Sequence, residues 1–163
     1  MQMLMIGYTR TNPDGKYVST DFRELIVREG INEISILNPA GLDITGLADE
    51  LAEIIGDDCI NNFDLPPLTT DQLLIKELKN QPWELLNSML KAVRQPGNCL
   101  FVLGRGAALH QHLMWLAAQI SDSSIIELYS SELIIKSANL AQKENFNDIG
   151  KRTLAVFPHL YIN

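Results

Sequence analysis

Residues 98–119 read NCLFVLGRGAALHQHLMWLAAQ, and this stretch decides the fold. Residues 99–103 are apolar at every position, which predicts a strand that is buried on both faces of a sheet. Residues 104–106 are a glycine-containing turn, and residues 107–119 then place apolar side chains at helical spacing. A doubly buried strand that passes directly into a helix is typical of a parallel sheet covered by helices.

The same alternation of strand and helix extends outward in both directions. Expected strands cover residues 3–8, 31–37, 59–65, 99–103 and 124–128, with a final edge strand at 153–162. Expected helices cover residues 20–29, 45–55, 107–119 and 131–143, with a longer helical stretch over about 69–94 in which Pro82 is a candidate break. Strands joined by helical crossovers predict one α/β domain over residues 1–163, a three-layer Rossmann-like sandwich with a mainly parallel sheet of five or six strands.

The segment after the first expected strand allows two interpretations. Residues 12–15 read NPDG, in which Pro presets φ and Gly tolerates positive φ, so a turn is predicted. A helix over residues 20–29 would follow, with Thr20 or Asp21 as its N-cap. Alternatively, the turn closes a β-hairpin whose second strand covers residues 16–20.

Composition and charge exclude several classes of protein. With 163 residues, of which 46% are hydrophobic and 20% charged, the chain suits a packed domain. Its net charge of −7 argues against duplex nucleic acid, whose binding depends on many Lys and Arg contacts, but a small anionic ligand needs few cations. No apolar run approaches the ~20 residues that span a bilayer, and the N-terminal residues lack the features of a secretory signal. We therefore expect a cytoplasmic protein without membrane contact.

Metal and cofactor sites are not expected. The two cysteines, Cys59 and Cys99, each lie in an apolar stretch, which favours free buried thiols over a disulfide. Two cysteines and three scattered histidines do not have the spacing of a zinc site. The chain also carries neither a dinucleotide-binding fingerprint nor a Walker loop.

Two further polar groups of residues bear on function. His110 and His112 are two positions apart on the expected helix and therefore point in different directions. His110 lies one turn into the helix after Gly106 and is placed to reach the preceding loop; the alternative is a solvated histidine or one at the edge of the core. Asp49 and Glu50 are expected on a solvated helix face.

The best candidate site lies at the carboxyl ends of the first and fourth expected strands. Ligands bind to open parallel sheets where the strand order reverses, which in the common order is between these two strands. Thr9 and Arg10 follow the first strand, and Gly104, Arg105 and Gly106 follow the fourth. Glycines allow close approach to the backbone, a helix N-terminus favours an anion, and Arg105 adds a bidentate cation. The alternative is that the glycines only form a tight turn and Arg105 is solvated.

At this point the chain resembles the CRISPR-associated Rossmann fold (CARF) family, nucleotide sensors of antiviral defence. The resemblance covers roughly residues 1–130 and rests on the order of strands and helices and on residues 98–128. The latter stretch is similar to the family's fourth strand, glycine-containing ligand loop, long helix and fifth strand. Family members are typically homodimers that bind cyclic oligoadenylates at the ends of strands one and four, and some cleave the ligand.

The resemblance assigns two loops to the ligand. Thr9 and Arg10 would form the first-strand loop, and Gly104, Arg105 and Gly106 the fourth-strand loop. The family's fourth-strand loop commonly reads Thr-Gly-Gly-Thr-Lys, so its Thr and Lys have no counterpart in this chain. Arg105 is the residue that would supply the cation in their place.

The leading hypothesis is a stand-alone, homodimeric, CARF-like domain that binds a nucleotide or cyclic oligonucleotide, with cleavage of the ligand left open and no catalytic residue assigned. The alternative is a non-catalytic adaptor or regulatory subunit that uses the α/β domain as a scaffold. A ligand-binding protein should have a basic pocket at the two loops, whereas an adaptor should have a flat apolar patch. A third possibility, a small-molecule enzyme with His110 as base, requires a closed pocket lined by His110.

Overall fold

A computed structural model of the protein describes residues 1–39, 41–67, 81–104 and 107–127. The expected helix over residues 131–143, the expected edge strand over 153–162 and the first part of the helical stretch at 69–94 lie outside the described residues. Arg105 and Gly106 of the candidate ligand loop also lie outside them.

Within the described residues, the centre of the fold is a five-stranded parallel sheet with the order β3-β2-β1-β4-β5. The strands are β1 (Gln2–Ile6), β2 (Glu33–Asn38), β3 (Ile60–Asp64), β4 (Cys99–Leu103) and β5 (Ser124–Glu127). In the central register Met3 pairs with Ile34 on one side and with Leu100 on the other. β1 and β4 are buried at every position, which explains why all their residues except Gln2 are apolar.

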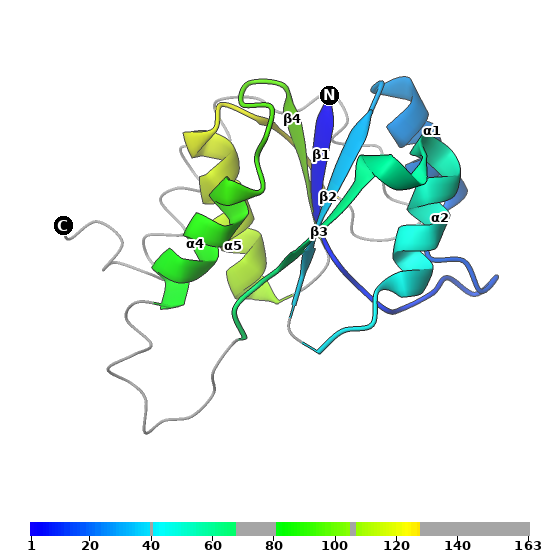
Figure 1. The fold of residues 1–163 in the computed structure, drawn as a ribbon, viewed down its shortest axis with the longest axis horizontal. Helices are drawn as coiled ribbons and strands as arrows, with labels where there is room; N and C mark the ends of the chain where they lie inside the picture. Colours follow the sequence, from blue (N-terminus) through cyan, green and yellow to red (C-terminus); the bar gives the residue numbers. More distant parts are fainter. Residues whose placement is uncertain (40, 68–80, 105–106, 128–163) are drawn as a thin grey trace.

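Helices cover both faces of the sheet (Figure 1). One face carries α1 (Thr20–Arg28) and α2 (Thr45–Ile55), which leads into the short 3₁₀ helix η1 (Asp57–Cys59); the other carries α4 (Gln81–Lys91) and α5 (Ala108–Ile120). The expected three-layer α/β sandwich is therefore confirmed. Every helix in the described part of the chain is too short or too polar to cross a bilayer.

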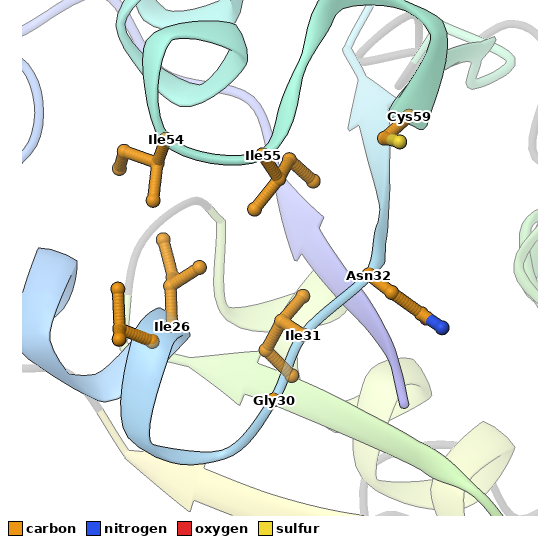
Figure 2. Close-up of a pocket in the computed structure, with 8 residues that line it drawn as sticks. Ile26, Gly30, Ile31, Asn32, Ile54, Ile55 and Cys59 are labelled. Carbon is orange, nitrogen blue, oxygen red and sulfur yellow. The ribbon is translucent and has the colours of Figure 1, made fainter.

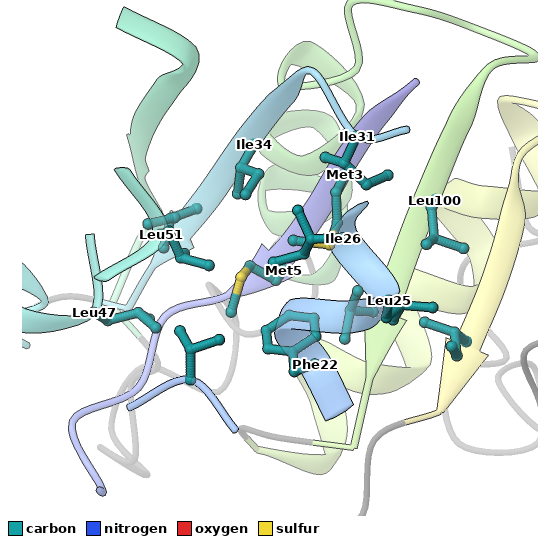
Figure 3. Close-up of a cluster of buried hydrophobic side chains, with 14 of the residues drawn as sticks. Met3, Met5, Phe22, Leu25, Ile26, Ile31, Ile34, Leu47, Leu51 and Leu100 are labelled. Atoms are coloured by element: carbon teal, nitrogen blue, oxygen red, sulfur yellow. The ribbon is translucent and has the colours of Figure 1, made fainter. Parts of the chain in front are cut away.

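Each face of the sheet has its own hydrophobic core, because successive strand side chains point to opposite faces. Met3, Met5 and Ile34 face α1 and α2, where they pack with the cluster around Phe22 and Leu51 (Figure 3). The opposite cluster is formed by the alternate strand residues and the inner sides of α4 and α5; it contains Leu4, Ile6, Leu37, Phe101, Leu103, Leu85, Met89, Leu113, Met114 and Ala117. Burial of each large aliphatic side chain contributes about 1.5–3 kcal/mol.

The β-hairpin alternative for residues 16–20 is wrong. The NPDG segment does form a turn, in which the Gly15 N–H donates to the Asn12 carbonyl at 2.9 Å and Gly15 has φ of 80°. No strand follows, because the backbone N–H groups of Tyr17 and Val18 donate to a carboxylate of α2 instead of to a neighbouring strand. The helix then begins at Thr20.

The N-cap of α1 is Ser19 and not Thr20 or Asp21, the two expected residues. Its Oγ accepts a hydrogen bond from the Phe22 backbone N–H at 3.2 Å, which satisfies one of the free donors of the first turn. Asp21 lies in that first turn, where the positive end of the helix dipole stabilises its negative charge.

Candidate functional site

The strand order places a topological switch point between β1 and β4. From β1 the chain proceeds through α1 to β2 and onward to β3, whereas from β4 it proceeds through α5 to β5 on the other side. The segments that leave the carboxyl ends of these two neighbouring strands therefore diverge to opposite faces, as Figure 1 shows. This is the position at which parallel sheets bind ligands, and it is the position predicted from the sequence.

The segment after β1 carries the first pair of predicted site residues. Tyr8 is buried, and its hydroxyl donates a hydrogen bond of 2.7 Å to the Tyr17 carbonyl. Thr9 and Arg10 follow it and are exposed. Among the described residues Arg10 has no ion-pair partner. Its guanidinium is therefore available to an anion at the end of β1.

The far end of the same segment is fixed to α2 by Glu50. Both carboxylate oxygens accept the Tyr17 backbone N–H, at 3.0 and 2.9 Å, and Oε2 also accepts the Val18 N–H at 2.8 Å. The Tyr17 ring lies over Gly46 so closely that a Cβ there would be 2.5 Å from Cε2. The expectation that Glu50 is on a solvated face is wrong, because this carboxylate is half-buried and bound to the backbone, while Asp49 is exposed as expected.

The segment after β4 leads into the N-terminus of α5. Gly104 has φ of 109°, a conformation that other residues rarely adopt. Arg105 and Gly106 lie outside the described residues, so their predicted role is untested. The N-cap position is occupied by Ala107, which has no side-chain oxygen to accept a hydrogen bond. The first N–H groups of α5 are thus left to another acceptor, and the helix dipole favours an anionic one.

His110 lies in the first turn of α5 on its buried face. Its side chain is 3% exposed, and neither ring nitrogen has a hydrogen-bond partner in the described part of the structure. Burial lowers the pKa of His110 from its ordinary value, so the imidazole is neutral at pH 7. His110 thus lies beside the carboxyl edge of the sheet, where α5 begins after β4.

Charges are unevenly distributed along this edge. Arg10 and Lys16 belong to the β1 segment, in which Asp14 accepts the Lys16 backbone N–H at 3.1 Å. Acidic residues end the outer strands, with Asp64 last in β3 and Glu127 last in β5. The described cations nearest to the switch point therefore lie on its β1 side.

Asn38 is the last residue of the neighbouring strand β2, and Asp43 follows that strand at the same edge. Oδ1 of Asn38 is buried without a hydrogen-bond partner among the described residues, whereas its amide donates to the Leu42 carbonyl at 3.3 Å. Asp43 accepts the side-chain hydroxyl of Thr45 at 2.7 Å and its backbone N–H at 3.1 Å, which together lower the pKa of this carboxyl group. Asp43 is therefore engaged with α2, while Asn38 keeps a free acceptor.

A pocket of about 310 Å³ lies at the opposite, amino-terminal edge of the sheet. Its lining comes from the C-terminal ends of α1 and α2 and from the residues that precede β2 and β3: Ile26, Val27, Gly30, Ile31, Asn32, Ile54, Ile55 and Cys59 (Figure 2). Sequence analysis did not predict this pocket. It is mainly apolar and has no charged side chain in its lining.

Neither the comparison with known proteins nor the arrangement of metal-binding side chains in the described residues assigns a function to the chain. No protein-family model matches the sequence, and no curated protein matches it significantly. Within residues 1–39, 41–67, 81–104 and 107–127, no group of three or more His, Cys, Asp or Glu side chains is placed to hold a metal ion. Both cysteines are free, Cys99 buried and Cys59 half-buried.

The predicted site residues are thus only partly accounted for. The fold brings Thr9 and Arg10 to the end of β1 and Gly104 to the end of the adjacent β4. Sequence reasoning missed the roles of Glu50 and Asn38, and it left His110 between two alternatives. The signal for His110 was its place on the apolar side of the helix, together with Leu113, Met114 and Ala117.

Proposed function

We propose that the protein binds a nucleotide or cyclic oligonucleotide at the switch point between β1 and β4. One observation carries the proposal: the strand order reverses where Arg10 follows one strand and the N-terminus of α5 follows the next. In this arrangement a phosphate accepts the first N–H groups of α5, and Arg10 neutralises its charge. Thr9 and Arg105 complete the contacts, and Gly104 and Gly106 allow the ligand to approach the backbone.

The CARF resemblance supports the same placement, because that family binds cyclic oligoadenylates at the ends of strands one and four. It also leads us to propose that the chain forms a homodimer, with the ligand bound across both copies. Sedimentation at ~10–50 μM protein checks this assembly. A monomer throughout that range, with ligand present, contradicts the dimer and leaves a one-chain nucleotide site to be tested separately.

Ligand cleavage is an additional activity that this site would support with little protein chemistry. In the proposed step the ligand's 2′-hydroxyl oxygen attacks the adjacent phosphorus in line, the bond to the 5′-oxygen breaks, and the proton passes to that leaving oxygen. The product is a 2′,3′-cyclic phosphate. Arg10 or Arg105 would stabilise the charge on the phosphorane, and Thr9 would position it.

Isothermal titration calorimetry with mono-, di- and cyclic oligonucleotides tests the proposal. Arg10→Ala and Arg105→Ala should each lower affinity at least tenfold, since a charge-assisted hydrogen bond contributes about 1.5–3 kcal/mol. The matched control is Arg28→Ala, which removes the same charge from the C-terminal end of α1, where Arg28 pairs with Glu29 at 3.1 Å. If no nucleotide binds below about 1 mM, a weak affinity by the usual scale, the proposed function is wrong.

The adaptor function is the second candidate, and the pocket at the amino-terminal edge favours it. The pocket is mainly apolar, and Val27 in its lining is 68% exposed, so it could receive an apolar side chain of a partner protein. The other large apolar side chains exposed in the described chain are Leu42 and Ile120, on separate elements. They do not extend the pocket into a flat patch. Nucleotide binding that depends on Arg10 excludes the adaptor as the main function.

A further inference from the structure

The apolar pocket at the amino-terminal edge of the sheet lies outside the proposed nucleotide site. Its volume of about 310 Å³ is at the lower end of the range for small-molecule sites. Ile26 and Ile31 lie on one side of the pocket and Ile54 and Ile55 on the other, and Figure 2 shows the two pairs of side chains facing one another. A lining of branched aliphatic side chains favours an aliphatic group over a polar one.

The end of α2 adds a hydrogen-bond acceptor to one wall of the pocket. In a continuing helix the N–H of Cys59 would donate to the Ile55 carbonyl, but it donates to the Gly56 carbonyl at 3.2 Å. Gly56 has φ of 100° and turns the backbone at this point. The Ile55 carbonyl thus loses its helical donor, and such terminal carbonyls are satisfied by water or by a bound molecule.

The charges around the pocket favour a cation. The C-terminal ends of α1 and α2 both contribute to its lining, and each carries the negative end of a helix dipole. Asp57 and Asp58 directly precede the lining residue Cys59, are exposed, and form no ion pair within the described residues. Glu29, at the end of α1, is paired with Arg28 at 3.1 Å. The uncompensated negative charge therefore lies on the α2 side.

The protein's own N-terminal amine shows how an ammonium group is held at this pocket. The Met1 ammonium donates to the Gly30 carbonyl at 3.4 Å and to Asn32 Oδ1 at 3.2 Å. Gly30 and Asn32 both line the pocket, between α1 and β2. The end of α2 offers the same kind of acceptor, a backbone carbonyl, on the other side of the pocket.

We propose that this pocket binds a small aliphatic amine, with its hydrocarbon part between the isoleucines and its ammonium group at the end of α2. The ammonium donates to the Ile55 carbonyl, and Asp57 and Asp58 neutralise its charge. This site is separate from the proposed nucleotide site, because the two lie at opposite edges of the sheet. Arg10→Ala should therefore leave amine binding unchanged.

Three probes with one hydrocarbon chain test the role of charge: hexylamine, hexan-1-ol and hexanoate. Titration at pH 7.5, followed by backbone amide resonances, should give hexylamine a dissociation constant of about 1 mM or lower, as expected for a compact ligand. Hexan-1-ol should bind about tenfold more weakly, since it lacks a charge-assisted hydrogen bond, and hexanoate more weakly still. Equal binding of hexylamine and hexan-1-ol overturns the inference and fits a pocket for an apolar side chain of a partner protein.

Val27→Lys tests the same charge preference from the side of the protein. Val27 lines the pocket and is 68% exposed, so the change should leave the fold intact. The added ammonium should reverse the order of hexylamine and hexanoate. The matched control is Ile120→Lys, at the exposed last residue of α5 on the other face of the sheet, which should keep the wild-type order. A wild-type order in Val27→Lys overturns the inference.

A milder change removes only the acidic side chains. Asp57→Asn combined with Asp58→Asn should weaken hexylamine by up to about fivefold, the range for exposed charge pairs, and leave hexan-1-ol unchanged. An equal loss for both probes would show that the two aspartates act through the structure of the pocket, and it would contradict their role in neutralising the ammonium.

The location of the amine is checked in the wild type. The amide resonances of Ile31 and Ile55 should shift with hexylamine, and iodoacetamide should alkylate Cys59 more slowly, because Cys59 lines the pocket. Unshifted resonances together with an unchanged rate at Cys59 place the amine elsewhere and overturn the inference. Amine binding at these residues without any nucleotide binding rejects the proposed function alone, and nucleotide binding without amine binding rejects this inference alone.

Discussion

The carboxylate of Glu50 holds the backbone of Tyr17, with Oε1 and Oε2 at 3.0 and 2.9 Å from its nitrogen. Oε2 also accepts the Val18 N–H at 2.8 Å. These bonds join α2 to the segment that leaves β1, and the Tyr8 hydroxyl, bonded to the Tyr17 carbonyl at 2.7 Å, closes the segment on its other side. The segment between Tyr8 and Tyr17, which contains the exposed Arg10, is therefore held by hydrogen bonds at both of its ends.

Glu50→Gln should lower the free energy of unfolding by about 1–3 kcal/mol, because an amide has one acceptor oxygen where the carboxylate has two, and its NH₂ group opposes a backbone donor. Urea denaturation measures the change. The matched control is Glu53→Gln on the same helix, whose exposed carboxylate lies 3.8 Å from Arg23 and should contribute within about 0.5 kcal/mol. Equal unfolding free energies for the two variants would show that the Glu50 bonds are not formed in solution.

Gly46→Ala should also destabilise the protein, although alanine is ordinarily favoured over glycine in helices. The added Cβ would lie 2.5 Å from Cε2 and 2.9 Å from Cζ of Tyr17, so the ring must move away from α2. Overpacking of this kind costs about 1–3 kcal/mol. Thermal unfolding of Gly46→Ala measures the loss, and the added methyl group should cost less when Tyr17→Ala has already removed the ring. An unchanged melting temperature in the single variant contradicts the close packing.

The sheet could be predicted because its physical signals are local. β4 is buried at all positions, so residues 99–103 carry an unbroken apolar sequence, and helices at 45–55 and 107–119 show their inward faces directly. The position of the switch point follows from the common strand order once the crossovers are recognised. These elements appear within one or two residues of their expected ends.

The contacts that shape the candidate site could not be predicted, since they join residues far apart in sequence. Glu50 accepts bonds from a segment 33 residues earlier, and nothing in its helix distinguishes it from a solvated acid. Gln2 occupies an apolar strand, where it donates to the Ala92 carbonyl at 2.7 Å and accepts the Arg94 N–H at 2.8 Å. The unpartnered state of His110 likewise depends on what the fold places around the ring.

The two thiols should differ in reactivity. Burial raises the pKa of Cys99 to about 12, so it has almost no thiolate at pH 8 and no access to a reagent. Cys59 is half-buried in the lining of the apolar pocket and should be alkylated first. Iodoacetamide labelling followed by peptide mass spectrometry should show one modified cysteine in the native protein and two after denaturation in urea. Comparable native labelling of Cys99 contradicts its burial.

The unpartnered ring of His110 predicts a stability that depends on pH. Its pKa in the folded protein is lowered from the ordinary 6.5, so below that pH the unfolded chain binds a proton that the folded chain does not. The free energy of unfolding therefore rises with pH across this window. The contribution of the neutral His110 ring to stability is complete above about pH 6.5, and it is lost as the pH falls toward the lowered pKa of His110 in the folded protein. Other groups also titrate below pH 6, which makes a comparison between variants necessary.

His110→Leu isolates this effect. In the absence of ligand the leucine variant should be more stable than the wild type at pH 7.5, because it buries no unpartnered imidazole, and its advantage should widen as the pH is lowered to 5. Met114→Leu is a volume-conserving change on the same buried face of α5. Its free energy of unfolding should differ from that of the wild type by the same amount at every pH between 7.5 and 5. Urea denaturation at a series of pH values measures both differences. If the difference for His110→Leu does not vary with pH, the imidazole titrates alike in the folded and unfolded protein, and the ring has a partner or solvent that the structure does not provide.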